Sequence, residues 1–137
     1  MRLAHARRMA GNEDGAQVAA QIIRQDLQAF SAAGGKNQNM YLAEAMIAAF
    51  DDDPDGVIGA LKSAMQHGLR GPLFFADPIF EALWNEPRFV ALQQELDAIL
   101  ATDHDKVLQL ICFNNPVPNH WQPLPETCEG IVAQQVL

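Results

Sequence analysis

The sequence predicts an all-α fold, and three observations lead to this class. Apolar and small residues recur at spacings of three and four through the first two-thirds of the chain, as on one face of a helix. No stretch alternates apolar and polar residues with the period of two that a half-buried strand needs. With 137 residues, 49% hydrophobic and 19% charged, the chain suits one globular domain that buries a core.

Two helical hairpins are expected, over residues 1–31 and 38–68. In the first, Asp14 can cap the second helix, whose apolar stripe comprises Ala16, Ala19, Ala20, Ile23, Leu27 and Phe30. The second hairpin carries one stripe from Tyr41 to Ala49 and another on Val57, Ile58, Leu61, Ala64 and Met65. Gly34 and Gly68 end these hairpins, because glycine readily adopts the left-handed conformation found after a helix.

The stretch DDDPDGVI, residues 51–58, raises the question of a calcium site at the corner of the second hairpin. Its aspartates alternate as in a calcium loop, but a twelve-residue loop begun at Asp51 ends at Lys62, where a bidentate Glu is needed. Pro54 instead suits the first turn of a helix that Asp53 caps. We therefore interpret this stretch as a corner between two helices.

Prolines mark the elements that follow. Those at positions 78 and 87 each come after an acidic residue, where a first helical turn tolerates proline, and they predict helices over 78–84 and 87–101. Thr102 with Asp105 resembles a capping box and opens a last helix, so the terminal helices span 78–111. Because further prolines follow at 116, 118, 123 and 125, we expect a helical domain of residues 1–111 and an extended Pro-rich tail over 112–137.

An internal repeat appears when the sequence is shifted by 41 residues. Asp14-Gly15-Ala16 then falls on Asp55-Gly56-Val57, so both units consist of a helix, an acidic-glycine corner and a second helix. Self-similarity at this scale is typical of helical-hairpin arrays, in which each pair buries its faces by stacking on its neighbours.

The residues of segment 38–72 resemble a tetratricopeptide (TPR) repeat. Its bulky and small positions are matched by Tyr41, Ala45, Leu61 and Ala64, whereas Val57 replaces a usual small residue. The run around Pro87-Arg88-Phe89 is similar to the segment that often follows TPR arrays in bacterial regulators. The resemblance covers about residues 1–101 and implies a TPR-like α-α superhelix.

The same resemblance implies a function. Arrays of this kind lie C-terminal to winged-helix transcription-factor, cyclase or kinase domains, so we expect a non-catalytic protein-interaction or sensory module at the end of a larger bacterial regulatory protein. Its protein or peptide ligand would lie on the concave surface of the first helices, at His5, Arg8, Asn39, Leu42 and Met46. Arg8 with Asn39 could hold a peptide carboxylate; ordinary packing or solvation is the alternative for each of these residues.

The net charge and the motifs of the chain indicate whether it binds nucleic acid, spans a membrane or holds a metal or cofactor. A net charge of −8 argues against nucleic-acid binding through this segment, and no apolar run approaches the ~18 residues of a membrane span. No cofactor or metal is expected, and Asp103-His104-Asp105 is interpreted as a solvated helix cap. Two alternatives stay open: a small helical metal protein or enzyme that uses His104, His120 or Cys112, and a dimerisation end-cap that forms a homodimer.

The two cysteines, Cys112 and Cys128, could form a disulfide in an oxidising compartment. Because no secretion signal is present, we favour reduced thiols and a cytoplasmic location, with a periplasmic one possible if the parent protein is membrane-anchored. Aromatic residues are dense between positions 74 and 89. We expect them to pack in the core, with an exposed partner-binding patch as the alternative.

Overall fold

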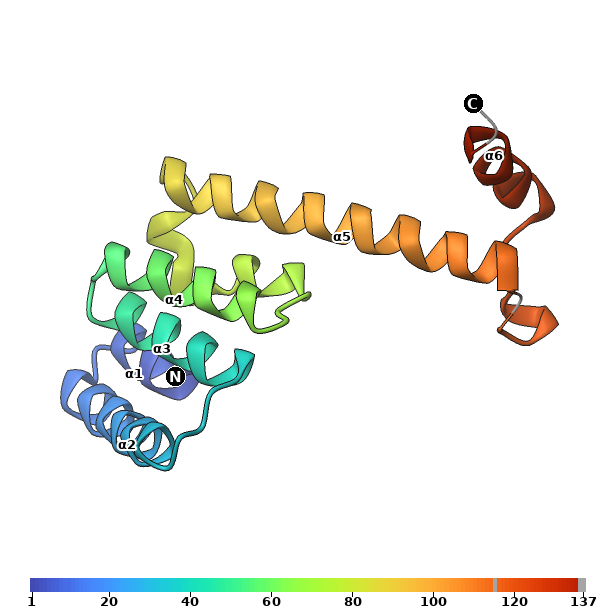
Figure 1. The fold of residues 1–137 in the computed structure, drawn as a ribbon. Helices are drawn as coiled ribbons and strands as arrows, with labels where there is room; N and C mark the ends of the chain where they lie inside the picture. Colours follow the sequence, from blue (N-terminus) through green and yellow to red (C-terminus); the bar gives the residue numbers. More distant parts are fainter. Residues whose placement is uncertain (115, 136–137) are drawn as a thin grey trace. The chain divides into compact units, whose positions relative to one another are not determined.

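The computed structural model describes residues 1–114 and 116–135, which form α- and 3₁₀-helices and no strand. The predicted all-α class is therefore confirmed for this part of the chain. The chain divides into two compact units, Met1–Leu96 and Asp97–Leu137 (Figure 1). Helix α5, Pro87–Asn114, begins in the first unit and continues into the second.

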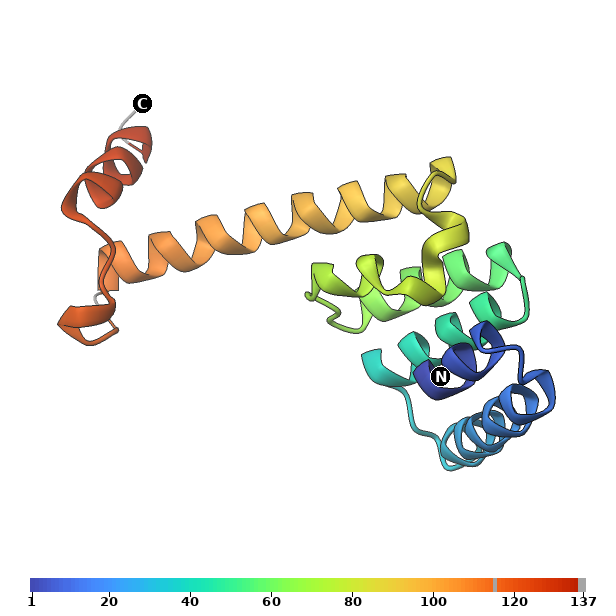
Figure 2. The same cartoon turned by 180° about the vertical axis from the view of Figure 1, so that it is seen from behind.

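The first unit opens with two pairs of helices, α1 (Arg2–Met9) with α2 (Glu13–Ala32) and α3 (Gln38–Phe50) with α4 (Pro54–Gln66). Within each pair the helices pack on each other, and α2 also contacts α3 (Figures 1 and 2). Many side chains at these contacts are small, and those with no exposed surface include Ala4, Ala16, Ala20, Ala45 and Ala64. Such residues allow helices to approach at the short end of the usual interaxial distances.

Side chains cap the N-termini of α2, α3 and α4 in the first unit, whereas α1 has no side-chain cap. Asn12 caps α2 by accepting a hydrogen bond from the amide of Gly15 at 2.9 Å. The predicted cap at Asp14 is therefore wrong, because Asp14 already lies in the first turn of the helix. Asp53 caps α4 as predicted, and it accepts from the amide of Gly56 at 2.9 Å. Each cap satisfies an amide that has no partner within its helix.

After α4 the chain turns through two short 3₁₀ helices, η1 (Pro72–Ala76) and η2 (Pro78–Leu83), before α5 begins. The ring of Phe89 lies 5.1 Å from that of Phe75 and 5.8 Å from that of Phe80, measured between centroids. All three rings are buried, which confirms the predicted core packing for these aromatics. Trp84 is partly exposed and donates its indole N–H to the carbonyl of Phe75 at 3.0 Å.

The start of α5 is tied to the start of α4. Glu86 accepts hydrogen bonds from the Phe89 amide at 2.8 Å and from Nε of Arg88 at 2.7 Å. The bond from Arg88 is the largest cause that holds the pKa of Glu86 below its usual value. Arg88 also donates to Asp55 at 2.6 Å, so one guanidinium links the two helix N-termini.

Helix α5 continues through residue 102, where the sequence predicted a boundary between two helices. The hydroxyl of Thr102 donates to the carbonyl of Ala98 at 2.9 Å. This bond to the carbonyl four residues earlier belongs to a residue inside a helix, whereas a cap would accept a bond from an amide. The predicted capping box at Thr102 is therefore wrong.

The second unit contains the end of α5, a 3₁₀ turn η3 (Asn119–Trp121) and helix α6 (Pro125–Gln135). The extended tail predicted over 112–137 is thus wrong for α6, because Pro125 occupies the first helical turn, where the missing amide N–H breaks no bond. Residues 115, 136 and 137 of that tail lie outside the described residues.

A disulfide joins Cys112 near the end of α5 to Cys128 in α6. The expected reduced thiols are therefore not found. The bond connects two helices that are separated along the chain by the proline-containing segment 116–124.

Candidate functional site

A groove crosses one face of the first unit, and we define it by three hollows that share lining residues. The first hollow has a volume of about 370 Å³ and lies between α1 and the η1–η2 segment. The second, of about 360 Å³, shares His5 and Pro78 with the first and extends to the C-terminal end of α3. The third, of about 250 Å³, shares Ala49, Asp52, Ile79 and Ala82 with the second and reaches the α3–α4 corner.

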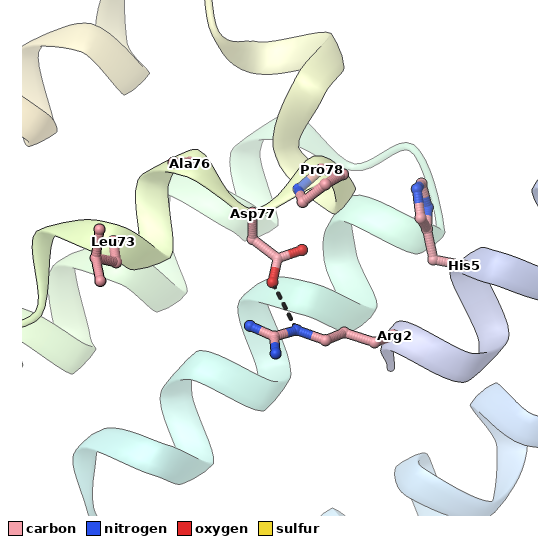
Figure 3. Close-up of a pocket in the computed structure, with 6 residues that line it drawn as sticks. All are labelled: Arg2, His5, Leu73, Ala76, Asp77 and Pro78. Atoms are coloured by element: carbon pink, nitrogen blue, oxygen red, sulfur yellow. Dashed lines mark hydrogen bonds and ion pairs between the residues drawn. The ribbon is translucent and has the colours of Figure 1, made fainter.

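One end of the groove is built on an ion pair between Arg2 and Asp77 (Figure 3). Asp77 is buried, accepts from Nε of Arg2 at 2.9 Å and caps η2 by accepting from the amide of Ile79 at 3.1 Å. These two donors offset the cost of burying a carboxylate. The side chain of Arg2 is 79% exposed, and its two Nη groups make no hydrogen bond within the described part of the chain.

The centre of the groove is held by Arg8, which joins the two helix pairs. Its guanidinium carbon lies 3.6 Å from the centroid of the Phe50 ring, and Nη1 donates to the Phe50 carbonyl. Nε and Nη2 donate to the two carboxylate oxygens of Glu13 at 3.1 and 3.0 Å. These bonds are the largest cause that lowers the pKa of Glu13, and a further bond from Gln17 adds to the effect. All three side-chain nitrogens of Arg8 therefore donate hydrogen bonds to groups of the first unit.

The acidic end of the groove comprises Asp52, which lines the second and third hollows, and Glu81, which lines the second. Of the four aspartates in the α3–α4 corner, Asp51 pairs with Arg24, Asp53 caps α4, and Asp55 pairs with Arg88. The carboxylate of Asp52, by contrast, has no hydrogen bond or ion pair among the described residues, and neither has that of Glu81. Both residues are exposed, so two uncompensated negative charges face this end of the groove.

The groove contains some, but not all, of the residues that the TPR resemblance suggested for a partner site. His5 and Arg8 line the groove. Leu42 is only 4% exposed and belongs to the core. The expectation that its side chain contacts a partner at the surface is therefore wrong. Asn39 is exposed and Met46 is partly exposed on α3.

The suggested clamp of Arg8 with Asn39 is not formed within one site. Arg8 lies on Phe50 at the C-terminal end of α3, whereas Asn39 is in its first turn. Eleven residues separate these two positions, which corresponds to about 16 Å along a helix. A single carboxylate cannot contact both side chains over that distance.

Sequence reasoning missed Arg2, Asp77, Asp52 and Glu81 as groove residues. The acidic corner was noticed, but nothing in the pattern distinguishes Asp52 from its paired neighbours. Arg2 and Asp77 are 75 residues apart, so their meeting depends on how η1 and η2 pack against α1. A local signal could not have identified them.

The alternative catalytic or metal-binding residues lie elsewhere in the chain. Cys112 is in a disulfide and therefore offers no thiolate. His104 and Asp105 are exposed on α5, with 3.6 Å between Nδ1 and the nearest carboxylate oxygen. The described residues contain no group of three or more His, Cys, Asp or Glu side chains arranged to hold a metal ion.

No family model matches the chain, and no curated protein or solved structure is significantly similar to it. Within residues 1–114 and 116–135, no helix combines the length and the apolar character that crossing a membrane requires.

Proposed function

We propose that the first unit is a TPR-like interaction module whose groove binds an extended segment of a partner protein, at the C-terminal end of a larger bacterial regulatory protein. The observation that carries the proposal is the groove itself, because its three connected hollows are open to solvent and carry charged groups without internal partners. Concave sites of this kind, with an apolar lining and a few polar groups, are typical of ligand sites.

The lining of the groove supports a binding role over a catalytic one. Ala49, Ile79 and Ala82 are apolar and line two of the hollows. The charged side chains either maintain the fold, as Asp77 and Arg8 do, or stand at the two ends. No Ser, Thr, Cys or Lys side chain is among the residues that line the three hollows, so the hydroxyl, thiol and amine nucleophiles of covalent catalysis are not found there.

The stacked helix pairs support the TPR-like part of the proposal. Small residues at Ala16, Ala20 and Ala45 are fully buried where the helices contact one another, as in arrays whose hairpins stack side by side. The position of the module in a regulatory protein rests on the sequence resemblance alone.

Selection of peptides from a random 12-residue display library tests the proposal. Peptides enriched on the folded chain should lose at least tenfold in affinity on Ala82→Arg, because Ala82 is exposed in two of the hollows and an arginine there fills them. Ala29→Arg, at an exposed site on α2, is the matched control and should leave the affinity unchanged.

Fluorescence polarisation gives the dissociation constants, and thermal melts confirm that both variants fold. If no peptide is enriched, or if Ala82→Arg and Ala29→Arg bind equally well, the groove is not the binding site.

A further inference from the structure

The two ends of the groove differ in charge. At the first end, Arg2 presents two Nη groups that no described residue uses (Figure 3), and His5 lines the same hollow. Asp77 is buried behind Arg2 and anchors only its Nε, so the guanidinium is held in place with its outer edge free. A guanidinium of this kind suits a carboxylate, since two parallel N–H donors match two oxygens.

The opposite end offers acceptors. Asp52 and Glu81 both line the second hollow, and neither carboxylate is paired within the described part of the chain. Arg8 lies in the same hollow but donates to Glu13 and to the Phe50 carbonyl, so its donors are already engaged. This end therefore favours a basic side chain.

Helix α1 gives an approximate distance from Arg2 to the second hollow, which Arg8 lines. Arg2 and Arg8 are six residues apart on α1, which is about 9 Å along a helix. An extended peptide advances about 3.3 Å per residue, so this distance corresponds to roughly three residues. Arg2 marks the cationic end, and Arg8 lies in the hollow that contains the acidic side chains.

We propose that the groove selects a partner segment in which an acidic residue and a basic residue are about three or four positions apart. The acidic group contacts Arg2 and the basic side chain lies between Asp52 and Glu81. Leu73, which is 84% exposed and lines the same hollow as Arg2, provides an apolar surface for a neighbouring side chain of the segment. This inference rests on the proposed function and adds the chemistry of the ligand to it.

The test uses the peptides selected from the 12-residue library and asks whether they carry this charge pattern. For the strongest peptide, Asp52→Asn combined with Glu81→Gln should weaken binding by roughly three- to tenfold at low salt, as expected for two partly exposed ion pairs. Replacing the basic residue of the peptide by Gln should remove the effect of this double variant. Asp26→Asn, an exposed acid on α2, is the control and should change nothing.

Two variants examine the cationic end. Arg2→Gln should weaken binding of peptides that keep their acidic residue, and Arg2→Lys, which keeps a positive charge beside Asp77, should retain most of the affinity. Lys36→Gln is the control for the loss of a positive charge at an exposed site. Chemical unfolding of each variant separates an effect on binding from an effect on folding.

The outcomes distinguish the two proposals. Peptides that need Ala82 but show no charge spacing, and whose affinity is the same for the Asp52→Asn, Glu81→Gln variant and the unmodified chain, overturn the charge pattern and leave the groove as a binding site. If no peptide depends on Ala82, both proposals fail. A consistent spacing of three or four, with coupling between the basic residue and the two carboxylates, supports both.

Discussion

At the scale of single residues, Asp52 combines an unusual backbone with a free side chain. Its φ is 56°, and it is the one non-glycine residue with a positive φ in the described part of the chain. Left-handed conformations are unfavourable for most side chains, although aspartate tolerates them better than others do. The residue thus remains in a conformation that glycine would adopt at no steric cost, with its carboxylate at the acidic end of the groove.

The backbone of Asp52 can be tested by comparing two substitutions. Asp52→Ala should lower the free energy of unfolding relative to Asp52→Gly by about 1 kcal/mol, because only glycine accepts a positive φ freely. Urea unfolding measures both values, and Ala29→Gly on the exposed face of α2 is a control of opposite sign. Equal stabilities for the two variants at position 52 would contradict the left-handed conformation.

At the scale of the elements, helix α6 depends on its link to α5. It has 11 residues, fewer than the ~12–15 below which isolated helices are marginal in water. The Cys112–Cys128 disulfide spans 16 positions in the sequence, and closing a loop of that size contributes about 3 kcal/mol in the chain-entropy account. The disulfide is therefore expected to be the main restraint on α6.

Reduction of this disulfide should release α6 without affecting the first unit. We expect amide hydrogen exchange at residues 125–135 to accelerate strongly in a thiol reductant, while the amides of α3 and α4 keep their protection. A Cys112→Ser, Cys128→Ser variant should exchange rapidly at α6 with or without the reductant. Persistent protection of α6 after complete reduction would show that packing, and not the disulfide, orders the helix.

At the scale of the whole molecule, two compact units share one long helix. The first unit owes its stacking to small residues at the helix contacts and to the buried phenylalanines Phe50, Phe75, Phe80 and Phe89. Closely packed protein cores tolerate added volume poorly, because side chains already occupy the available space. The distance between the two helices of each pair therefore depends on the small residues at their contacts.

A larger side chain at a stacking position tests this dependence. Ala45→Leu should reduce the free energy of unfolding by about 1–3 kcal/mol, the usual cost of overpacking, since Ala45 has no exposed surface. Ala29→Leu on the exposed face of α2 should change the stability by less than about 0.5 kcal/mol. Urea denaturation measures both. If Ala45→Leu is as stable as the control, the contact between helices is looser than the buried alanines indicate.

The sequence by itself determined the all-α class, the cap at Asp53 and the core role of the phenylalanines. Each of these follows from local preferences. Apolar periodicity predicts helices, and the short side chain of Asp53, which accepts a hydrogen bond, caps the helix that begins at Pro54. The sequence also predicted a helix boundary at Thr102 and an extended tail, and the structure contradicts both at Thr102 and in α6. A residue that can cap a helix also occurs inside one, and a proline also occurs in a first helical turn, so the local pattern does not distinguish these cases.

Only the tertiary structure decided which charges are free and where the groove lies. The groove unites α1, the α3–α4 corner and η2, and its Arg2–Asp77 pair joins residues 75 positions apart. The same packing buries Leu42 and commits Arg8 to Phe50 and Glu13. Local periodicity specifies which face of a helix is apolar, but the partner of each exposed charge depends on segments that the fold brings together from distant parts of the chain.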